Sequence, residues 1–106
     1  MPNSTINLAA NCNYSTLVAR ISSLIGKNFS TNDFYKQDVS GGVFVSGVAK
    51  GYVISAYNHP SKYHSATASG GVLGCGSEKS VASAGKWAVA WVCMGVANRR
   101  SYYGFS

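Results

Sequence analysis

Residues 86–94, KWAVAWVCM, indicate the fold more clearly than any other part of the chain. Side chains of a β-strand point alternately to its two faces, so this run divides into two sets. Trp87, Val89, Trp91 and Cys93 share one face, and Ala88, Ala90, Val92 and Met94 share the other. Because both faces are apolar, the run predicts a strand that is buried on one side and either covered or used for binding on the other.

Shorter runs of similar character surround this strand. Four of them have strand composition: residues 43–45, 52–57, 65–68 and 101–105. Turn-forming residues interrupt and separate these runs: Gly47, Gly51, Asn58 and Pro60. Many short strands with turn signals about every ten residues are typical of an antiparallel β-sandwich. The predicted fold class is therefore mainly β.

One short helix is expected near residues 14–26, ahead of the strands. Four apolar residues recur there at helical spacing: Leu17, Ile21, Leu24 and Ile25. Either Asn13 or Ser15 can cap the start of this helix, and Gly26 can end it. The apolar stripe predicts a helix that packs on the rest of the protein.

The chain divides at its first glycine doublet. A length of 106 residues is usual for one domain and allows one modest core. Beyond the polar stretch of residues 28–40, Gly41 and Gly42 open the strand-rich part. We therefore expect an N-terminal extension, residues 1–41, and a β-sandwich, residues 42–106, with the helix packed outside or beneath the sandwich.

The charge of the chain is positive and uneven. Nine basic residues against three acidic ones give a net charge of +6. Residues 1–40 contribute +1, from three basic and two acidic residues. Residues 41–106 contribute +5, from six basic residues and one acidic residue. Such a field attracts anionic partners, whether nucleic acid, lipid headgroups, teichoic acids or a pyrophosphate. The alternative interpretation is that the charge only keeps a surface rich in Gly and Tyr soluble.

The three cysteines, Cys12, Cys75 and Cys93, permit three different single disulfides with one thiol left over. Their wide spacing does not match the paired cysteines of a zinc site, and we expect neither a metal nor a cofactor. Two interpretations are open. One is a single bridge, for which Cys75 to Cys93 across neighbouring strands is the favoured pair, and the other is three buried free thiols.

Residues 57–65, YNHPSKYHS, form the most polar stretch. Its polar groups can bind sugars or phosphates, and its rings can stack on them. The candidate ligand-binding residues here are Tyr57, His59, Ser61, Lys62 and His64. A second cluster, in which the arginines suit phosphate oxygens, adds Arg99, Arg100, Tyr102 and Tyr103. The first stretch is equally explained as a hairpin turn, and the second equally suits single-stranded nucleic acid.

The sequence favours a binding protein over an enzyme. His59 and His64 are the two histidines, and the three acidic residues lie far from them in the chain. No nucleophile elbow, phosphate loop or H-E-x-x-H motif is present, so we predict no catalytic residues. Two alternatives remain: a small basic nuclease that uses His59, His64 and Lys62, and a secreted effector with a lectin-like surface.

At these residues the chain resembles the lactococcin 972 family of bacteriocins. The matching motifs are Gly42-x-Phe44-x-x-Gly47, Ser55-x-Tyr57-x-His59-x-Ser61-Lys62-x-His64-Ser65-Ala66-Thr67, Ala84-Gly85-x-Trp87-Ala88 and Tyr102-Tyr103-Gly104-Phe105. The resemblance covers residues 42–106, and the spacing from Gly42 to Thr67 needs no gap. Phe44 stands where the family has Trp, and residues 1–41 have no counterpart in the family pattern.

The resemblance implies a sandwich of two small antiparallel sheets. It also implies secretion by a Gram-positive bacterium and killing of related cells by binding the cell-wall precursor lipid II, which blocks septum formation without a pore. Lipid II combines a pyrophosphate, an amino sugar and a peptide, which suits a cationic protein. No signal peptide is visible, and no apolar run approaches the ~20 residues of a membrane span, so the expected extracellular location rests on the resemblance. A homodimer is left open.

Overall fold

β7 (Trp87–Cys93) lies inside a five-stranded sheet, between β1 and β4. The computed structural model describes residues 3–97 and 99–105. Within β7, Trp87 and Val89 pack in a core that includes a helix, whereas Ala88 and Ala90 pack toward a second sheet. Protein therefore covers both apolar faces of this strand, and neither face is free for binding.

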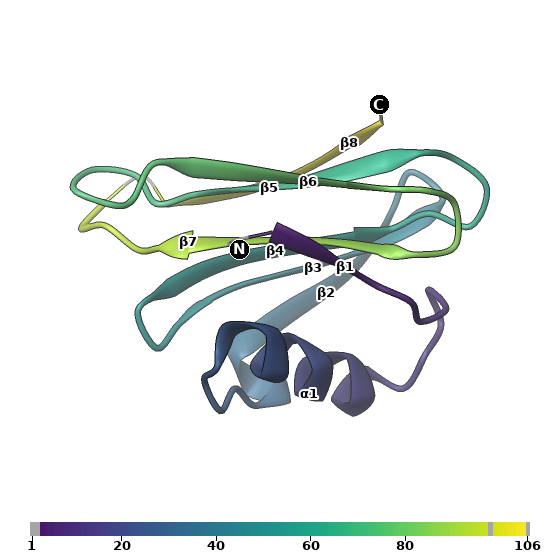
Figure 1. Ribbon diagram of the computed structural model, residues 1–106, viewed down its shortest axis with the longest axis horizontal. Helices are drawn as coiled ribbons and strands as arrows, with labels where there is room; N and C mark the ends of the chain where they lie inside the picture. The colour runs from purple at the N-terminus through teal and green to yellow at the C-terminus, as the bar shows by residue number, and fades with distance from the viewer. Residues whose placement is uncertain (1–2, 98, 106) are drawn as a thin grey trace.

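Eight strands form two antiparallel sheets among the described residues, which confirms the predicted β-sandwich (Figure 1). The five-stranded sheet has the order β1-β7-β4-β3-β2, and the three-stranded sheet has the order β6-β5-β8. The other strands of the first sheet are β1 (Asn3–Ile6), β2 (Phe34–Val39), β3 (Gly42–Ala49) and β4 (Tyr52–Asn58). The second sheet contains β5 (His64–Ser69), β6 (Ser77–Ala82) and β8 (Arg100–Phe105).

The molecule has three layers (Figure 1). The three-stranded sheet lies on top, the five-stranded sheet lies in the middle, and the helix α1 lies below. Small side chains pack between parts of the two sheets: Val53, Ala68, Ala90 and Val92. Elsewhere between the sheets Phe44 and Tyr57 pack against alanines. Small side chains at the facing positions let the two sheets approach closely.

The predicted helix is α1 (Tyr14–Ile25). The Asn13 side chain accepts a hydrogen bond from Ser15 N, and Gly26 ends the helix in the left-handed conformation at φ 83°. Leu17 and Ile21 are buried against the outer face of the five-stranded sheet, in one core with both tryptophans. The helix thus covers a face that would otherwise be apolar and exposed.

Three strands were not predicted. The polar stretch of residues 28–40 contains η1 (Thr31–Asp33) and β2, and β1 and β6 also lie outside the predicted runs. All three are edge strands, so neighbours on one side only hold them in place. β2 is largely exposed, yet six of its residues pair with β3. Backbone pairing rather than apolar alternation therefore defines these strands.

Two tight turns join the central hairpins. Ser40 and Gly41, at φ 51° and 83°, connect β2 to β3, so the expected boundary at the glycine doublet falls inside a hairpin. Lys50 and Gly51, at φ 50° and 85°, connect β3 to β4. Positive φ at both central residues is the type I′ geometry that suits the twist of a hairpin.

A disulfide joins Cys75 to Cys93, with their Cα atoms 5.3 Å apart. This is the pair that the sequence favoured, but the bridge does not lie across neighbouring strands as expected. Instead it links the loop between β5 and β6 to the end of β7, and thereby connects the two sheets. Cys12 is a free, half-buried cysteine that packs against the core shared by the helix and the five-stranded sheet.

Candidate ligand-binding site

The loop between β4 and β5 is organised by His59. The Nδ1 atom of His59 accepts hydrogen bonds from the backbone N–H groups of Ser61 and Lys62, each at 3.1 Å. Because Nδ1 acts as the acceptor, the proton of the neutral ring is on Nε2. A Cβ atom on Gly41 would lie 3.1 Å from Nε2, so the missing side chain of this glycine leaves space beside the N–H donor.

His64 is fully buried and fixed between two segments. Its Nδ1 lies 2.7 Å from the carbonyl oxygen of Lys62, and its Nε2 lies 2.7 Å from the carbonyl oxygen of Lys86. Both ring nitrogens therefore face backbone carbonyls, which leaves neither for a ligand. His64 connects the loop before β5 to the start of β7.

Tyr57 is also fully buried. Its hydroxyl donates to the carbonyl oxygen of Val39 at 3.0 Å, and its ring centroid lies 4.7 Å from that of Tyr103. Burial raises the pKa of the Tyr57 phenol above its usual value, and the neighbouring Tyr103 adds to the shift. The phenol therefore stays neutral and remains a hydrogen-bond donor at neutral pH.

These two residues correct the list of candidate ligand contacts. Tyr57 and His64 were expected at the ligand because they are polar and close in sequence to Lys62. The structure encloses both side chains, so they support the site from below and do not touch a ligand in this conformation. Their rings pack edge to face, with centroids 5.6 Å apart.

Above this support lies a surface that we call the aromatic end, defined by Ser40, His59, Lys62, Tyr103 and Phe105. Four of these side chains are exposed, whereas His59 is largely buried, with 6% of its surface exposed. The Lys62 ammonium lies 5.1 Å from the centroid of the Phe105 ring, within cation–π distance. The hydroxyls of Tyr103 and Ser40 are 3.1 Å apart. Ser61 is exposed in the same loop. The aromatic end combines a cation, neutral donors and two partly exposed rings.

Phe105 and Ser40 were absent from the predicted site. Side chains on a strand alternate, so Tyr103 and Phe105 share a face of β8, and both lie within 6.1 Å of Tyr57 between ring centroids. Tyr103 and Phe105 are two residues apart in the terminal motif, so this spacing could have added Phe105 to the candidate site. Ser40 carried no such signal, because only the β2–β3 turn brings it to Tyr103.

The arginine cluster lies at the other end of β8. Arg100 is opposite Ser69 and Phe105 is opposite His64, so the two ends of β8 are about 17 Å apart along the strand. Tyr102 alternates with Tyr103 and points to the outer face of the three-stranded sheet. Arg99 approaches Met94, with Nη1 3.7 Å from Sδ. Lys62 and the two arginines therefore do not form one compact patch.

The geometry does not assemble an acid–base pair from the two histidines. His64 is enclosed with both nitrogens occupied, and among residues 3–97 and 99–105 no hydrogen bond joins His59 to a carboxylate. Proton transfer catalysis needs such groups within reach of a substrate. The described residues also contain no group of three or more His, Cys, Asp or Glu side chains that could hold a metal ion.

Comparisons with known proteins identify the family. Searches of curated proteins and of solved structures find no match to the chain. In the part of the chain that the structure describes, no helix is long and apolar enough to cross a membrane. The family model described as Bacteriocin (Lactococcin_972) matches residues 40–103. This match covers more than half of the sequence and includes β3 to β7 and most of β8, so the chain belongs to the lactococcin 972 family of bacteriocins.

Proposed function

We propose that this bacteriocin is secreted, binds lipid II in the envelope of Gram-positive bacteria and blocks septum formation without catalysing a reaction. The observation that supports this proposal is the distribution of groups along β8. The strand begins at Arg100 beside Arg99 and ends at the aromatic end, where Lys62 and Phe105 meet. One extended ligand with an anion at one end and a sugar and peptide at the other fits this order.

The arginines are assigned to the pyrophosphate. Arg99 and Arg100 are exposed, and a guanidinium offers paired donors that match phosphate oxygens. The aromatic end is assigned to the sugar and peptide. Tyr103 and Phe105 present apolar ring surface, while His59 Nε2–H and the Lys62 ammonium donate hydrogen bonds. Arg100 and Tyr102 share the outer face of β8, whereas Tyr103 and Phe105 lie on its inner face, so one ligand would reach both groups along this edge strand.

The proposal is tested by asking whether added lipid II protects target cells from the protein. Purified protein is added to growing Gram-positive cells with and without excess lipid II, and direct binding to lipid II is measured in parallel. We expect lipid II to prevent killing. Arg99→Gln with Arg100→Gln should weaken lipid II binding by about tenfold or more, because each arginine loses a charged hydrogen bond. The loss should shrink as salt rises, since exposed charges are screened over about 8 Å at physiological ionic strength.

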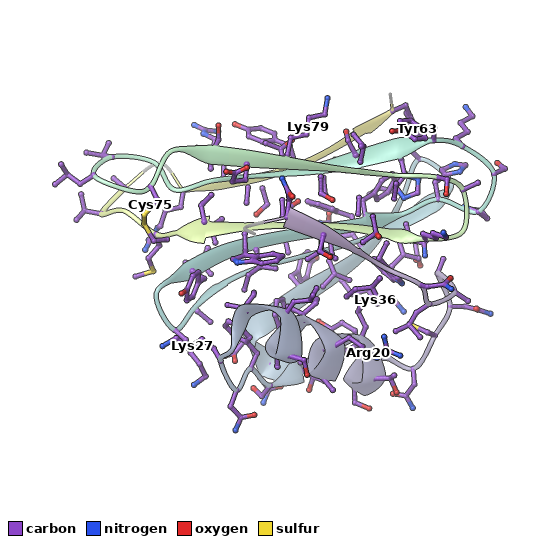
Figure 2. The ribbon with its side chains drawn as sticks, in the orientation of Figure 1. Arg20, Lys27, Lys36, Tyr63, Cys75 and Lys79 are labelled. Carbon is purple, nitrogen blue, oxygen red and sulfur yellow. A yellow bond between two sulfur atoms is a disulfide. The ribbon has the colours of Figure 1, made fainter. Side chains whose placement is uncertain are left out.

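A matched control is the double variant Arg20→Gln with Lys27→Gln. Arg20 lies in α1 and Lys27 just after it, on the opposite side of the molecule from the three-stranded sheet (Figure 2). This variant removes the same net charge but should bind lipid II like the wild type. Equal loss in both double variants would show that only net charge matters. Cleavage of RNA or DNA by the wild type that disappears in His59→Gln would instead establish the nuclease alternative.

A further inference from the structure

An exposed apolar cluster projects from the end of the molecule opposite the aromatic end. It consists of Val72, Leu73, Met94 and Val96, and we call it the apolar tip. Leu73 is 86% exposed and Val96 is 70% exposed. The loop between β5 and β6 and the segment after β7 carry these residues at the left of Figure 1. Large aliphatic side chains gathered in this way mark a surface that binds another apolar phase.

The backbone of the apolar tip is hydrogen-bonded within the protein. Val72 N donates to Ala97 O at 2.9 Å, and Val96 N donates to Val72 O at 2.8 Å. Gly95 N donates to Gly70 O at 2.7 Å. A peptide segment can enter a lipid environment only when its polar backbone groups already have partners. The N–H groups of Val72, Met94 and Val96 meet this condition.

The fold holds the tip in a defined shape. Leu73 has φ 62°, in the left-handed region that bulky residues rarely adopt. The Cys75–Cys93 disulfide fixes the base of the loop. A Cβ atom on Gly95 would lie 1.9 Å from the carbonyl oxygen of Val72, so only glycine allows the two segments to approach this closely. The loop therefore presents Leu73 to the outside at a conformational cost.

Basic side chains surround the tip. Met94 N donates to Gly51 O at 2.9 Å, which places the β3–β4 turn and its exposed Lys50 at this end. Arg99 contacts Met94, and Arg100 follows it. Glu78 is the nearby acidic residue, and its carboxylate is half-buried and accepts from Asn3 Nδ2 at 3.5 Å. The apolar tip thus has a cationic rim.

We propose that the apolar tip inserts into the boundary between headgroups and acyl chains of an anionic bilayer, with Lys50, Arg99 and Arg100 at the level of the headgroups. Apolar side chains ringed by Lys and Arg are the chemistry that such an interface selects. This binding goes beyond lipid II recognition and does not depend on it. It also orients the protein, because the arginine end of β8 then lies nearest the membrane and the aromatic end lies farthest from it.

Vesicle sedimentation without any lipid II tests this proposal. Wild-type protein is mixed with vesicles of phosphatidylcholine alone or of phosphatidylcholine with phosphatidylglycerol. We expect binding to the anionic vesicles and little binding to the neutral ones. Leu73→Asn keeps a residue that tolerates positive φ and removes the apolar group, so it should weaken partitioning by about tenfold or more.

The chain offers a matched pair for the control. Val96→Thr at the tip should weaken vesicle binding, whereas Val81→Thr, which changes an exposed valine on β6, should leave it unchanged.

Leu73→Trp gives a direct measure of how deeply the tip enters the bilayer. Its fluorescence should shift to shorter wavelength and be quenched by brominated lipids, while Trp87 and Trp91 remain buried and contribute a constant background.

Several results would overturn the proposal. In one, Leu73→Asn binds anionic vesicles as well as the wild type does, while near-ultraviolet circular dichroism shows that both proteins are folded. Another is a Leu73→Trp signal that brominated lipids do not quench. A protein that fails to sediment with anionic vesicles but dimerises through the tip would show that a second copy covers this surface. If the protein binds lipid II but does not bind these vesicles, the insertion proposal is wrong and the proposed function is unaffected.

Discussion

Gly41 lies beside the Nε2 donor of His59. It has φ 83°, and a Cβ there would lie 3.1 Å from His59 Nε2. We therefore expect Gly41→Ala to destabilise the fold by about 1 kcal/mol, because alanine is strained at positive φ, and also to weaken lipid II binding. Urea unfolding and lipid II titration measure the two effects separately.

Gly26 provides the control for this prediction. It has the same φ of 83° at the end of α1, and no atom lies within 4 Å of a Cβ built there. Gly26→Ala should therefore cost similar stability and leave lipid II binding intact. Parallel loss of binding in both variants would mean that backbone strain, and not access to His59, explains the effect.

Tyr57 provides a pH-dependent test of the support beneath the aromatic end. Tyr57→Phe removes the bond to Val39 O and should lower the unfolding free energy by about 1 kcal/mol at pH 7. Burial raises the pKa of this phenol in the folded state above its unfolded value near 10. The stabilisation is therefore complete below pH 10 and is lost as pH rises through the folded pKa.

The measurement compares wild type with Tyr57→Phe by urea unfolding from pH 7 to pH 11. The difference in unfolding free energy between the two proteins should shrink above pH 10, because only the wild type has a buried phenol at residue 57 to ionise. Groups remote from residue 57 contribute equally to both proteins and cancel, whereas Tyr103 interacts with the Tyr57 phenol and is part of the measured difference. A difference that stays constant across the range would show that burial of the hydroxyl does not favour its neutral form.

At the scale of elements, the disulfide links the two sheets at one end. Cys75 and Cys93 are 18 residues apart in sequence, and closing a loop of this size stabilises a protein by about 3 kcal/mol. Changing both to Ser should remove roughly this amount. Cys12→Ser, in the free cysteine, is the control and should cost less. Thermal unfolding without reductant measures both, and an equal cost would contradict a stabilising role for the bridge.

The sequence predicted the elements that carry their own periodicity. α1 and β7 have apolar residues at helical or alternating spacing, and both are where they were expected. β2 and β6 contain Lys and acidic residues, and pairing with a neighbouring strand makes them strands. Such edge strands depend on contacts between distant residues, which no local pattern reveals.

The sequence indicates which residues have the chemistry of a binding site, but it does not show how deeply each side chain is buried. Local density of polar groups selected His59, Lys62 and the arginines, and they remain candidates for ligand contact. The same criterion also selected Tyr57 and His64, because polarity does not distinguish a residue that binds a ligand from one whose bonds are all internal. The separation of Lys62 from Arg100 follows from the register of β8 on β5, which is fixed only in the folded chain.

For the whole molecule, residues 3–39 complete the fold. They supply both edge strands of the five-stranded sheet and the helix that covers its outer face. A fragment of residues 42–106 would expose Trp87, Trp91 and Ile54, so we expect it not to fold cooperatively. Thermal unfolding and binding of an apolar dye measure this. A fragment with a sharp transition and no dye binding would show that the sandwich is an independent unit.

The position of the Cys75–Cys93 bridge has a consequence for the cell that makes the protein. Thiols stay reduced in the bacterial cytoplasm and are oxidised outside it. Under the secretion proposed above, the newly made chain would lack the crosslink at the base of the loop that carries Leu73 until it is exported. The tip would then be least well formed on the inner side of the producer's own membrane and would reach its final shape outside the cell.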